Sequence, residues 1–597
     1  MSKDYTEAFE TFEFDLPPIR GFPELRWAGK RPFKSTQYFP AQKKESYGDP
    51  TDGWWNQVFW GDNLQVMSHL LRDYRGKVDL IYLDPPFDSK ADYKKKIGLK
   101  GANTFTDRSS FEESQYADIW TSDGYLQWLY ERIIICKEFL RDGGSIFVHC
   151  DWHKSHQIRN ILDEIFTPTA FMNEIIWHYY NKMQGNINKF AANHDVIIWY
   201  KSGADPKFNK IREKRDKPVQ QIKRVWNSET QSLVNAKDET GKVVYINSTH
   251  KTVDDVWRMS MLQPADKVEP TGYPTQKPEH LIARVIQAAS DPGDLVFDPF
   301  MGSGTTQAVA MKLGRRFLGS DINLAAVETA IERFNIIRRC HDQNPIDCDL
   351  FDEDEQRKPQ KFYTGFEVYN VNNYDLFRNP VEAKELIGEA MELQPLSASS
   401  AFDGQREGYL VKIMPVNRIS TRQDLNEVIN GLDFKAFERR KAEAPNKPVE
   451  RIHLVCMGHE PDLGSHLILE AKKSGFDIEV MVTDLIRDKA HLHFKKSSDA
   501  RLAIENGELV IAGFFPMNLL QKLSLESDTV EDWRQLVESV KVDFHYDGAV
   551  LTPAIVDAPG KDELVAGRYA IPDDAGTIRV KITDLLSESW EGEIKNG

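Results

Sequence analysis

The sequence predicts an α/β protein with a largely parallel sheet, followed by an α+β C-terminal region. Over residues 54–345, short apolar runs of strand length alternate with segments whose apolar residues recur at helical spacing. That alternation is typical of βαβ units, whose strands are buried between helices. After residue 360 the pattern changes to mixed helices and strands, with antiparallel strands indicated near the C-terminus.

Length and composition limit the class of protein. The 597 residues are too many for one ordinary domain, and we expect two to four. No apolar run approaches the roughly 18–20 residues of a membrane span, and the acidic N-terminus lacks the apolar core of a signal peptide. The five cysteines are scattered without a CxxC pair, so neither a metal site nor a disulfide framework is indicated. We therefore expect a cytoplasmic protein that does not enter a membrane.

The first part of the chain leads into the predicted sheet. Residues 1–53 are expected to form an extended arm, because the prolines of LPP, GFP, RPF and YFP remove backbone donors. A strand near 58–62 and a helix near 64–74 follow. The apolar run 77–84 is the next strand, and residues 88–123 are expected to be a long loop.

Helices and strands then alternate up to an acidic linker. Helices are expected at 125–140, 153–165, 279–289, 305–313 and 323–339, and strands at 145–150, 174–180, 194–200, 295–298 and 316–321. Residues 201–272 are polar with weak periodicity and include the basic run 207–224. This run allows local DNA binding on a chain whose net charge is −16. Residues 346–360 are expected to be the linker, and 361–597 an accessory region that adds no chemical group to catalysis.

Residues 295–321 contain a strand, a glycine turn, a helix and a second strand. Gly302 and Gly304 let the backbone approach a ligand, and free N–H groups at the helix start favour a polar or anionic group. There is no G-K-[ST] of a P-loop, and Gln307 stands where a dinucleotide fingerprint has its third glycine. Asp321 follows Asp298 by 23 residues, which suits a carboxylate bound to ribose hydroxyls. The remaining candidate ligand is a nucleoside cofactor without a pyrophosphate, and S-adenosylmethionine (SAM) fits this description.

The strand at 77–84 ends in Asp84-Pro85-Pro86-Phe87. Two consecutive prolines stop a strand and fix a rigid loop. An acid, two rigid residues and an aromatic residue thus lie at the carboxyl end of a parallel strand, where open α/β sheets bind ligands. An ordinary strand-terminating turn is the alternative interpretation.

The motifs DPPF and DPFMGSGTT, in this order, resemble the β class of DNA amino-methyltransferases, which includes the modification subunits of type III restriction systems. WGDNL at 60–64 and YPTQKPE at 273–279 also match, and the resemblance covers about residues 54–340. It implies a Rossmann-like class I SAM-dependent methyltransferase sheet with a circularly permuted motif order. It also implies double-stranded DNA as partner and a target-recognition insert within 201–272. A homodimer and a restriction or defence-system partner subunit are further expectations.

The resemblance also implies roles for single residues. Asp84 and the carbonyl of Pro85, held by Pro86, would accept hydrogen bonds from the amino group of a flipped base, on which Phe87 would stack. The cofactor would be bound by Asp298, Phe300, Gly302, Ser303, Gly304, Asp321, Asp62, Thr275, Gln276 and Lys277. Of these, Asp321 would bind the ribose, Asp62 would lie near the adenine, and residues 275–277 would approach the methionine end. The alternatives are a helix N-cap for Asp62 and a solvated charge for Lys277.

We therefore expect an enzyme that transfers a methyl group from SAM to the N6 amino group of adenine in DNA. Cytosine-N4 methylation is the nearest alternative, although family members that act on cytosine more often carry Ser in place of Asp84. A non-catalytic recognition subunit is the alternative from another class, and the intact Asp84 and glycine loop disfavour it. His149, His153, His156 and His178 lack metal-ligand spacing and are expected to be structural.

Overall fold

A computed structural model describes most of the chain. The described residues are 11–13, 24–86, 92–98, 110–117, 122–181, 190–228, 230–263, 269, 275–343, 361–371, 384, 387–388, 391, 393–394, 396, 401–406, 408–416, 420–432, 450–460, 462–473, 475–484, 498–516, 519–520, 530, 532–560 and 563–596. No helix within these ranges is both long enough and apolar enough to cross a membrane.

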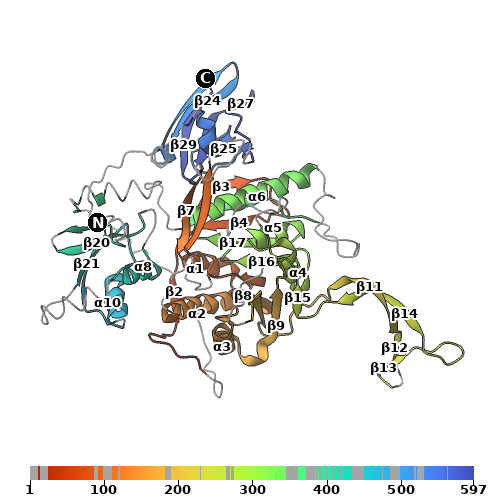
Figure 1. Ribbon diagram of the computed structural model, residues 1–597. Helices are drawn as coiled ribbons and strands as arrows, with labels where there is room; N and C mark the ends of the chain where they lie inside the picture. The colour runs from red at the N-terminus through yellow and green to blue at the C-terminus, as the bar shows by residue number, and fades with distance from the viewer. Residues whose placement is uncertain are drawn as a thin grey trace, which may run out of the picture.

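A ten-stranded sheet forms the centre of the protein (Figure 1). Its strand order is β15-β9-β10-β8-β5-β16-β17-β4-β18-β3. The strands are β3 (Ala41–Tyr47), β4 (Asn56–Trp60), β5 (Val78–Leu83), β8 (Leu140–Asp151), β9 (Phe171–His178), β10 (His194–Lys201), β15 (Val256–Arg258), β16 (Leu295–Asp298), β17 (Arg316–Asp321) and β18 (Phe366–Val371). The strands from β8 to β18 are parallel, and the pairs β8–β10, β10–β9 and β18–β3 are antiparallel. The predicted α/β class is confirmed.

Helices cover both faces of this sheet. One face packs against α1 (Asn63–Tyr74), α2 (Ser122–Phe139) and α3 (Ser155–Phe166), and the other against α4 (Glu279–Ala289), α5 (Thr305–Lys312) and α6 (Leu324–Gln343). Successive residues of a strand point to opposite faces. In β5, accordingly, Leu80 is buried in one core and Ile81 in the other. This burial on both faces explains why the central strands are continuous apolar runs.

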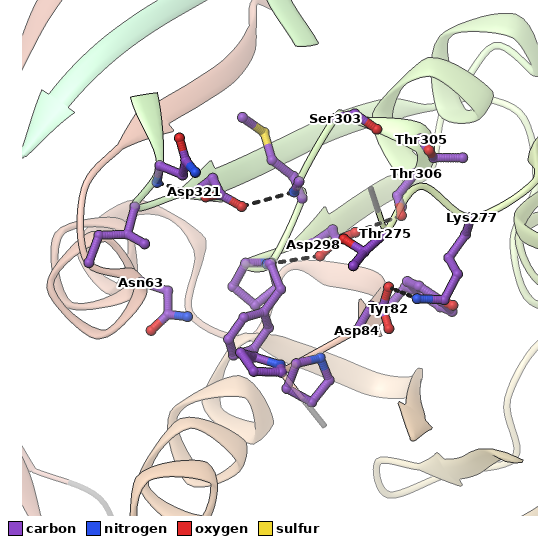
Figure 2. Close-up of a pocket in the computed structure, with 18 of the residues that line it drawn as sticks. Asn63, Tyr82, Asp84, Thr275, Lys277, Asp298, Ser303, Thr305, Thr306 and Asp321 are labelled. Carbon is purple, nitrogen blue, oxygen red and sulfur yellow. Dashed lines mark hydrogen bonds and ion pairs between the residues drawn. The ribbon is translucent and has the colours of Figure 1, made fainter. Parts of the chain in front are cut away.

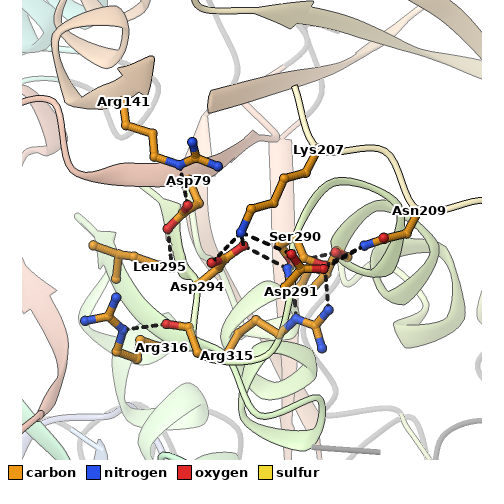
Figure 3. A network of polar contacts seen from close by, with 12 residues as sticks. Asp79, Arg141, Lys207, Asn209, Ser290, Asp291, Asp294, Leu295, Arg315 and Arg316 are labelled. Atoms are coloured by element: carbon orange, nitrogen blue, oxygen red, sulfur yellow. Dashed lines mark hydrogen bonds and ion pairs between the residues drawn. The ribbon is translucent and has the colours of Figure 1, made fainter. Parts of the chain in front are cut away.

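A polar network fixes the amino ends of β5 and β16 (Figure 3). Asp79 of β5 accepts a hydrogen bond from the backbone N–H of Leu295, at 2.9 Å, and pairs with Arg141. Lys207 binds Asp294 at 2.6 Å, which ties the segment after β10 to the turn before β16. The two strands that carry the DPPF and DPF motifs are therefore held in register from their far ends.

The sheet extends beyond the expected limits of 54–345. β3 comes from the expected arm, and β18 comes from the expected accessory region. β18 pairs with both β4 and β3, and Phe366 stacks on Tyr47 with ring centroids 4.7 Å apart. β3 is the edge strand and β18 lies next to it, and neither of the two sequences contains a long apolar run. The expected linker, 346–360, lies outside the described residues.

Two segments expected to lack regular structure contain β-ribbons. Within 88–123, β6 (Asp92–Gly98) and β7 (Ser110–Ala117) form an antiparallel pair, so the expected long loop is wrong there. Within 201–272, β11 (Arg212–Ile222) pairs with β14 (Tyr245–Thr252), and β12 (Arg224–Asn227) pairs with β13 (Ser232–Asn235). These four strands project away from the body as an arm (Figure 1). Because most of the arm is exposed on both faces, its sequence shows no apolar alternation.

The C-terminal region contains two further units. The C-terminal α/β unit has β19 (Gly404–Arg406), β20 (Tyr409–Ile413), β21 (Glu450–Cys456) and β22 (Ile478–Asp484) in one sheet, with α8 (Leu425–Asn430) and α10 (Leu463–Lys473). The C-terminal β unit has β23 (Ser498–Glu505), β24 (Glu508–Pro516) and β27 (Arg568–Ala570) in one sheet and β25 (Val537–Asp543), β26 (Ile555–Asp557), β28 (Thr577–Asp584) and β29 (Ser589–Lys595) in another. The short strands β1 (Thr11–Glu13) and β2 (Ser35–Gln37) pair with each other. The two units lie on different sides of the central sheet (Figure 1).

Candidate active site

A cavity lies at the carboxyl ends of β5 and β16 (Figure 2). β5 continues through α2 to β8 on one side, whereas β16 continues through α5 to β17 on the other. Open α/β sheets bind ligands where their connections diverge in this way. The sequence-predicted residues that line the cavity are Asp62, Asp84, Pro85, Pro86, Thr275, Gln276, Lys277, Asp298, Phe300, Gly302, Ser303 and Asp321. Phe87 lies outside the described residues.

Two carboxylates, the buried Asp298 and the half-buried Asp321, shape the glycine turn after β16. Asp298 accepts hydrogen bonds from the backbone N–H of Phe300 at 2.9 Å and from the Thr306 hydroxyl at 2.6 Å. Asp321, at the end of β17, accepts from the backbone N–H of Gly302 at 2.9 Å. Burial raises the pKa of Asp298 to about 7 and that of Asp321 to about 6, against the lowering effect of these hydrogen bonds. Both carboxyls therefore titrate near neutral pH.

The two glycines of the turn have different surroundings. Gly302 lines the cavity, and its φ of 52° lies in the left-handed region. Gly304, with a φ of 74°, precedes α5 and does not line the cavity. A Cβ atom at Gly304 would lie 2.6 Å from Phe334 and 2.9 Å from Ala330, both on α6. α6 therefore occupies the space beside Gly304, and the cofactor contact expected of this residue stays a prediction.

Asp84 and Lys277 meet in the cavity. The Lys277 ammonium forms an ion pair with Oδ2 of Asp84. The other oxygen, Oδ1, is buried, and within the described part of the chain it has no hydrogen-bond partner. Figure 2 shows Asp84 and Lys277 on the opposite side of the cavity from Asn63 and Asp321. Lys277 is therefore not the solvated charge of the alternative interpretation, and Asp84 retains a free acceptor.

A buried histidine lies behind Asp84. His149, on β8, is fully buried, and its Nδ1 is 3.9 Å from Oδ1 of Asp84. Nε2 of His149 lies 3.3 Å from a carboxylate oxygen of Asp195, and Nδ1 lies 2.7 Å from the Tyr82 hydroxyl. Because a carboxylate only accepts, Nε2 donates to Asp195, and with the proton on Nε2 the ring accepts from the Tyr82 hydroxyl through Nδ1. The sequence did not indicate this network, since the three residues lie on three separate apolar strands.

Asp62 caps a helix and also lines the cavity. Its carboxylate accepts from the backbone N–H groups of Leu64, at 3.0 Å, and Gln65, at 3.3 Å, and so caps α1. It also lines the cavity, where it forms a buried ion pair with Arg132 at 3.2 Å. The helix cap thus holds a charged acceptor at the cavity wall.

Comparisons with known proteins identify the class of enzyme. Residues 78–332 match the model of a family described as DNA methylase. These residues include most of the cavity wall, and we refer to them as the methylase domain. The Type II methyltransferase M.EcaI of Enterobacter cloacae is 28% identical over 381 residues, which are 54% of this chain and 80% of M.EcaI. The DNA adenine methyltransferase YhdJ of Escherichia coli (strain K12) is 26% identical over 280 residues, which are 47% of this chain and 82% of YhdJ.

Solved structures also resemble the methylase domain. The crystal structure of the M1.HpyAVI–SAM complex is 21% identical and covers 47% of this chain and 98% of its own, with a TM-score of 0.29. The cytosine-N4-specific PvuII DNA methyltransferase is 15% identical and covers 49% and 90%, with a TM-score of 0.30. Scores this low support no conclusion about this chain, and its fold follows from the sheet described above.

The wall of the methylase cavity also includes residues that the sequence analysis missed. Most come from the methylase domain itself: Asn63, Tyr82, Trp128, Ile282, Pro299, Met301, Thr305, Thr306, Ile322 and Asn323. Gln423, however, belongs to the C-terminal α/β unit. Its Oε1 accepts a hydrogen bond from Nε1 of Trp128 at 3.1 Å. A residue after 360 therefore lies in the cavity wall. From the sequence, we expected this region to be separate from the site.

Proposed function

We propose that this DNA methylase uses SAM as methyl donor and methylates the N6 amino group of an adenine flipped out of double-stranded DNA. The observation that carries the proposal is one shared cavity. On one side it has Asp84, whose buried Oδ1 has no hydrogen-bond partner among the described residues, and on the other the glycine turn with Asp298 and Asp321. The first group suits an amino substrate, and the second suits a nucleoside cofactor.

The residues of the cavity fit SAM chemically. The Asp321 carboxylate can accept hydrogen bonds from ribose hydroxyls, and Asp62 can accept from the amino group of the cofactor's adenine. Trp128 and Phe300, with ring centroids 5.5 Å apart, provide an aromatic surface beside them. The carboxylates of Asp84 and Asp298 suit the positive sulfonium. Bound SAM supplies an activated methyl group. The tasks of the protein are therefore to bind and orient the two reactants and to accept a proton.

Asp84 and Pro85 would prepare the amino group for attack. The nitrogen lone pair of an exocyclic amine is delocalised into the base, which makes the amine a weak nucleophile. Two fixed acceptors, Oδ1 of Asp84 and the carbonyl of Pro85, would bind the two N–H groups and favour a localised lone pair. Lys277 holds Oδ2 and thereby fixes the carboxylate. Asp84 would then accept the proton that the amine loses.

Adenine is the proposed target because Asp84 stands where family members that act on cytosine more often carry Ser. The relative YhdJ, a DNA adenine methyltransferase, has the same kind of target. Cytosine N4 is the second candidate, since it is also an exocyclic amine.

The projecting arm formed by β11, β12, β13 and β14 is the proposed DNA-contacting segment. The projecting arm carries exposed basic residues, among them Lys214 on β11, Arg224 on β12 and Lys223 between these two strands. Trp226 and Tyr245 are 64% and 58% exposed on the same ribbons. A two-stranded ribbon fits the major groove, and basic side chains neutralise phosphates. The homodimer, the restriction or defence-system partner and the cytoplasmic location stay predictions.

The test uses the full chain, SAM with an isotopically labelled methyl group, and unmethylated DNA. After digestion to nucleosides, mass spectrometry should find the label in N6-methyladenine. Label in N4-methylcytosine would contradict the target, and no labelled base from a protein that binds SAM would contradict the acceptor class. Asp84→Ala should lower turnover at least about 100-fold while SAM binding persists. Asp205→Ala is the matched control, because that side chain is 94% exposed and does not line the cavity.

A further inference from the structure

The C-terminal α/β unit reaches the methylase cavity through a short, firmly held turn. The turn is the 3₁₀ helix η4 (Arg422–Asp424), and Thr421 and Asp424 close a capping box around it. The backbone N–H of Arg422 donates to the Glu460 carboxylate at 3.0 Å. Glu460 follows β21, and its own N–H donates to the carbonyl of Ser420 at 3.0 Å. The turn is thus fixed to the carboxyl end of a parallel strand rather than left as a free loop.

Gln423, in the middle of this turn, has a defined amide orientation. An indole N–H can only donate, so the partner of Trp128 must be the amide oxygen of Gln423. The NH₂ group is left as the donor of the side chain. Among the described residues, no group accepts a hydrogen bond from it. The amide oxygen of Gln423 is thus hydrogen-bonded to the cavity wall, and its NH₂ group can donate to a ligand in the cavity.

Gln423 lies on the Asp62 side of the cavity. Its partner Trp128 contacts the Arg132 guanidinium, 4.3 Å from the ring centroid, and Arg132 pairs with Asp62 at 3.2 Å. Trp128 also meets Phe300 edge to face. The carboxylates of this side, Asp62 and Asp321, can accept hydrogen bonds but cannot donate them. Gln423 adds the complementary donor beside an aromatic surface, and an adenine nucleoside carries both donors and acceptors.

We propose that the amide NH₂ of Gln423 donates a hydrogen bond to an acceptor on the adenosine portion of SAM. The C-terminal α/β unit then completes the cofactor site of the methylase domain. The inference rests on SAM being the cofactor, as proposed above. Because η4 is bonded to the loop after β21, a displacement of this unit would also change SAM affinity.

The experiment measures the binding of SAM and of 5′-methylthioadenosine to the full-length protein by titration calorimetry. Methylthioadenosine has the adenosine portion but no amino acid. Gln423→Ala should weaken both ligands by the same factor, about three- to tenfold, the value of one hydrogen bond. With saturating SAM and DNA, kcat should stay near that of the wild type, because the contact is equal in ground and transition states. Asn426→Ala, three residues later on α8 and outside the cavity wall, should bind both ligands like the wild type.

Gln423→Glu separates a direct contact from support of Trp128. A carboxylate still accepts from the indole but donates nothing, so this variant should bind SAM at least as weakly as Gln423→Ala. Wild-type affinity in Gln423→Glu would overturn the inference, as would Gln423→Ala affinities within twofold of the wild type. A loss for SAM without a loss for methylthioadenosine would refute the assignment to adenosine. If the wild-type protein does not bind SAM, the proposed cofactor is wrong. This measurement is made before any variant is tested, so the two failures can be distinguished.

Discussion

Four buried charges join the C-terminal β unit to the central sheet, and removing one of them should destabilise the protein strongly. Glu45 of β3 and Glu328 of α6 face Lys541 of β25 and Lys581 of β28, and all four side chains are less than 10% exposed. Lys541 lies 2.8 Å from Glu328 and 3.2 Å from Glu45, and Lys581 lies 2.7 Å from Glu328. The two carboxylates and two ammonium groups balance, and removing any one of the four leaves a net charge in the cluster.

The perturbation is Lys541→Met, which keeps the apolar stem and removes the charge. Two buried carboxylates would then share Lys581 alone, and losing one partner of a buried ion pair costs about 3–5 kcal/mol. The assay is denaturant unfolding, in which a shift of the midpoint at constant slope reports stability. Lys361→Met is the control, because Lys361 also forms an ion pair, with Asp52 at 2.7 Å, but both side chains are more than half exposed. A midpoint for Lys541→Met equal to that of the wild type would refute the reasoning.

The stability difference between the wild type and Lys541→Met should depend on pH with a defined sign. Burial alone would raise the pKa of Glu45, but Lys541 and Lys581 outweigh burial and lower it below the ordinary value of 4.5. Glu328 and Glu45 raise the pKa of Lys541 above 10.5, against the effect of burial. The carboxylate contribution is therefore lost as the pH falls below about 4.5, and the lysine contribution is lost as it rises above about 10.5. The difference in the free energy of unfolding between the wild type and Lys541→Met should be constant between these two pH limits and should decrease outside them.

Three further predictions concern the cofactor site and the arm. SAM affinity should rise as the pH increases from about 5 to 8, because burial raises the pKa of Asp321 to about 6 and that of Asp298 to about 7, and the ionised carboxylates are the stronger acceptors and attract the positive sulfonium; a flat calorimetric profile would contradict this. Gly302→Val should weaken SAM binding more than about tenfold, because valine rarely adopts a positive φ and its side chain would enter the cavity; unchanged affinity in a folded variant would count against the site. Replacing four basic residues of the arm by Ala should flatten the plot of log K against log salt for DNA by about 0.9 per lost phosphate contact, and an unaltered slope would indicate a solvated face; the residues are Lys214, Arg215, Lys223 and Arg224.

The central strands and the motifs at their ends could be predicted because their signals are local. β5 and β16 are short apolar runs with every residue buried, and each ends at an acid followed by proline. Carboxyl ends of parallel strands meet at one edge of a sheet, so Asp84 and Asp298 had to lie near each other. The positions of α4 and α5 followed in the same way from apolar spacing and from the glycine turn.

Other features depend on partners that are distant in the sequence. Gly302 and Gly304 look equivalent, and only the packing of Phe334 and Ala330 against Gly304 decides which of them faces the cavity. His149 lies within an apolar run that reads as an ordinary buried strand. Its link to Asp195 arises because β10 pairs antiparallel with β8 in one particular register.

The C-terminal region is joined to the rest of the protein by contacts between residues distant in the sequence, which changes how its role must be tested. β18 is a strand of the central sheet, the four-charge cluster ties the β unit to β3 and α6, and Gln423 lies in the cavity wall. A chain shortened near residue 355 would lose all three together. It would expose the edges of β3 and β4 and leave Glu45 and Glu328 without their lysines, so a loss of methylation would not locate the cause. Point variants separate the contributions: Lys541→Met acts on stability without touching the cavity, and Gln423→Ala acts on the cavity without touching the cluster.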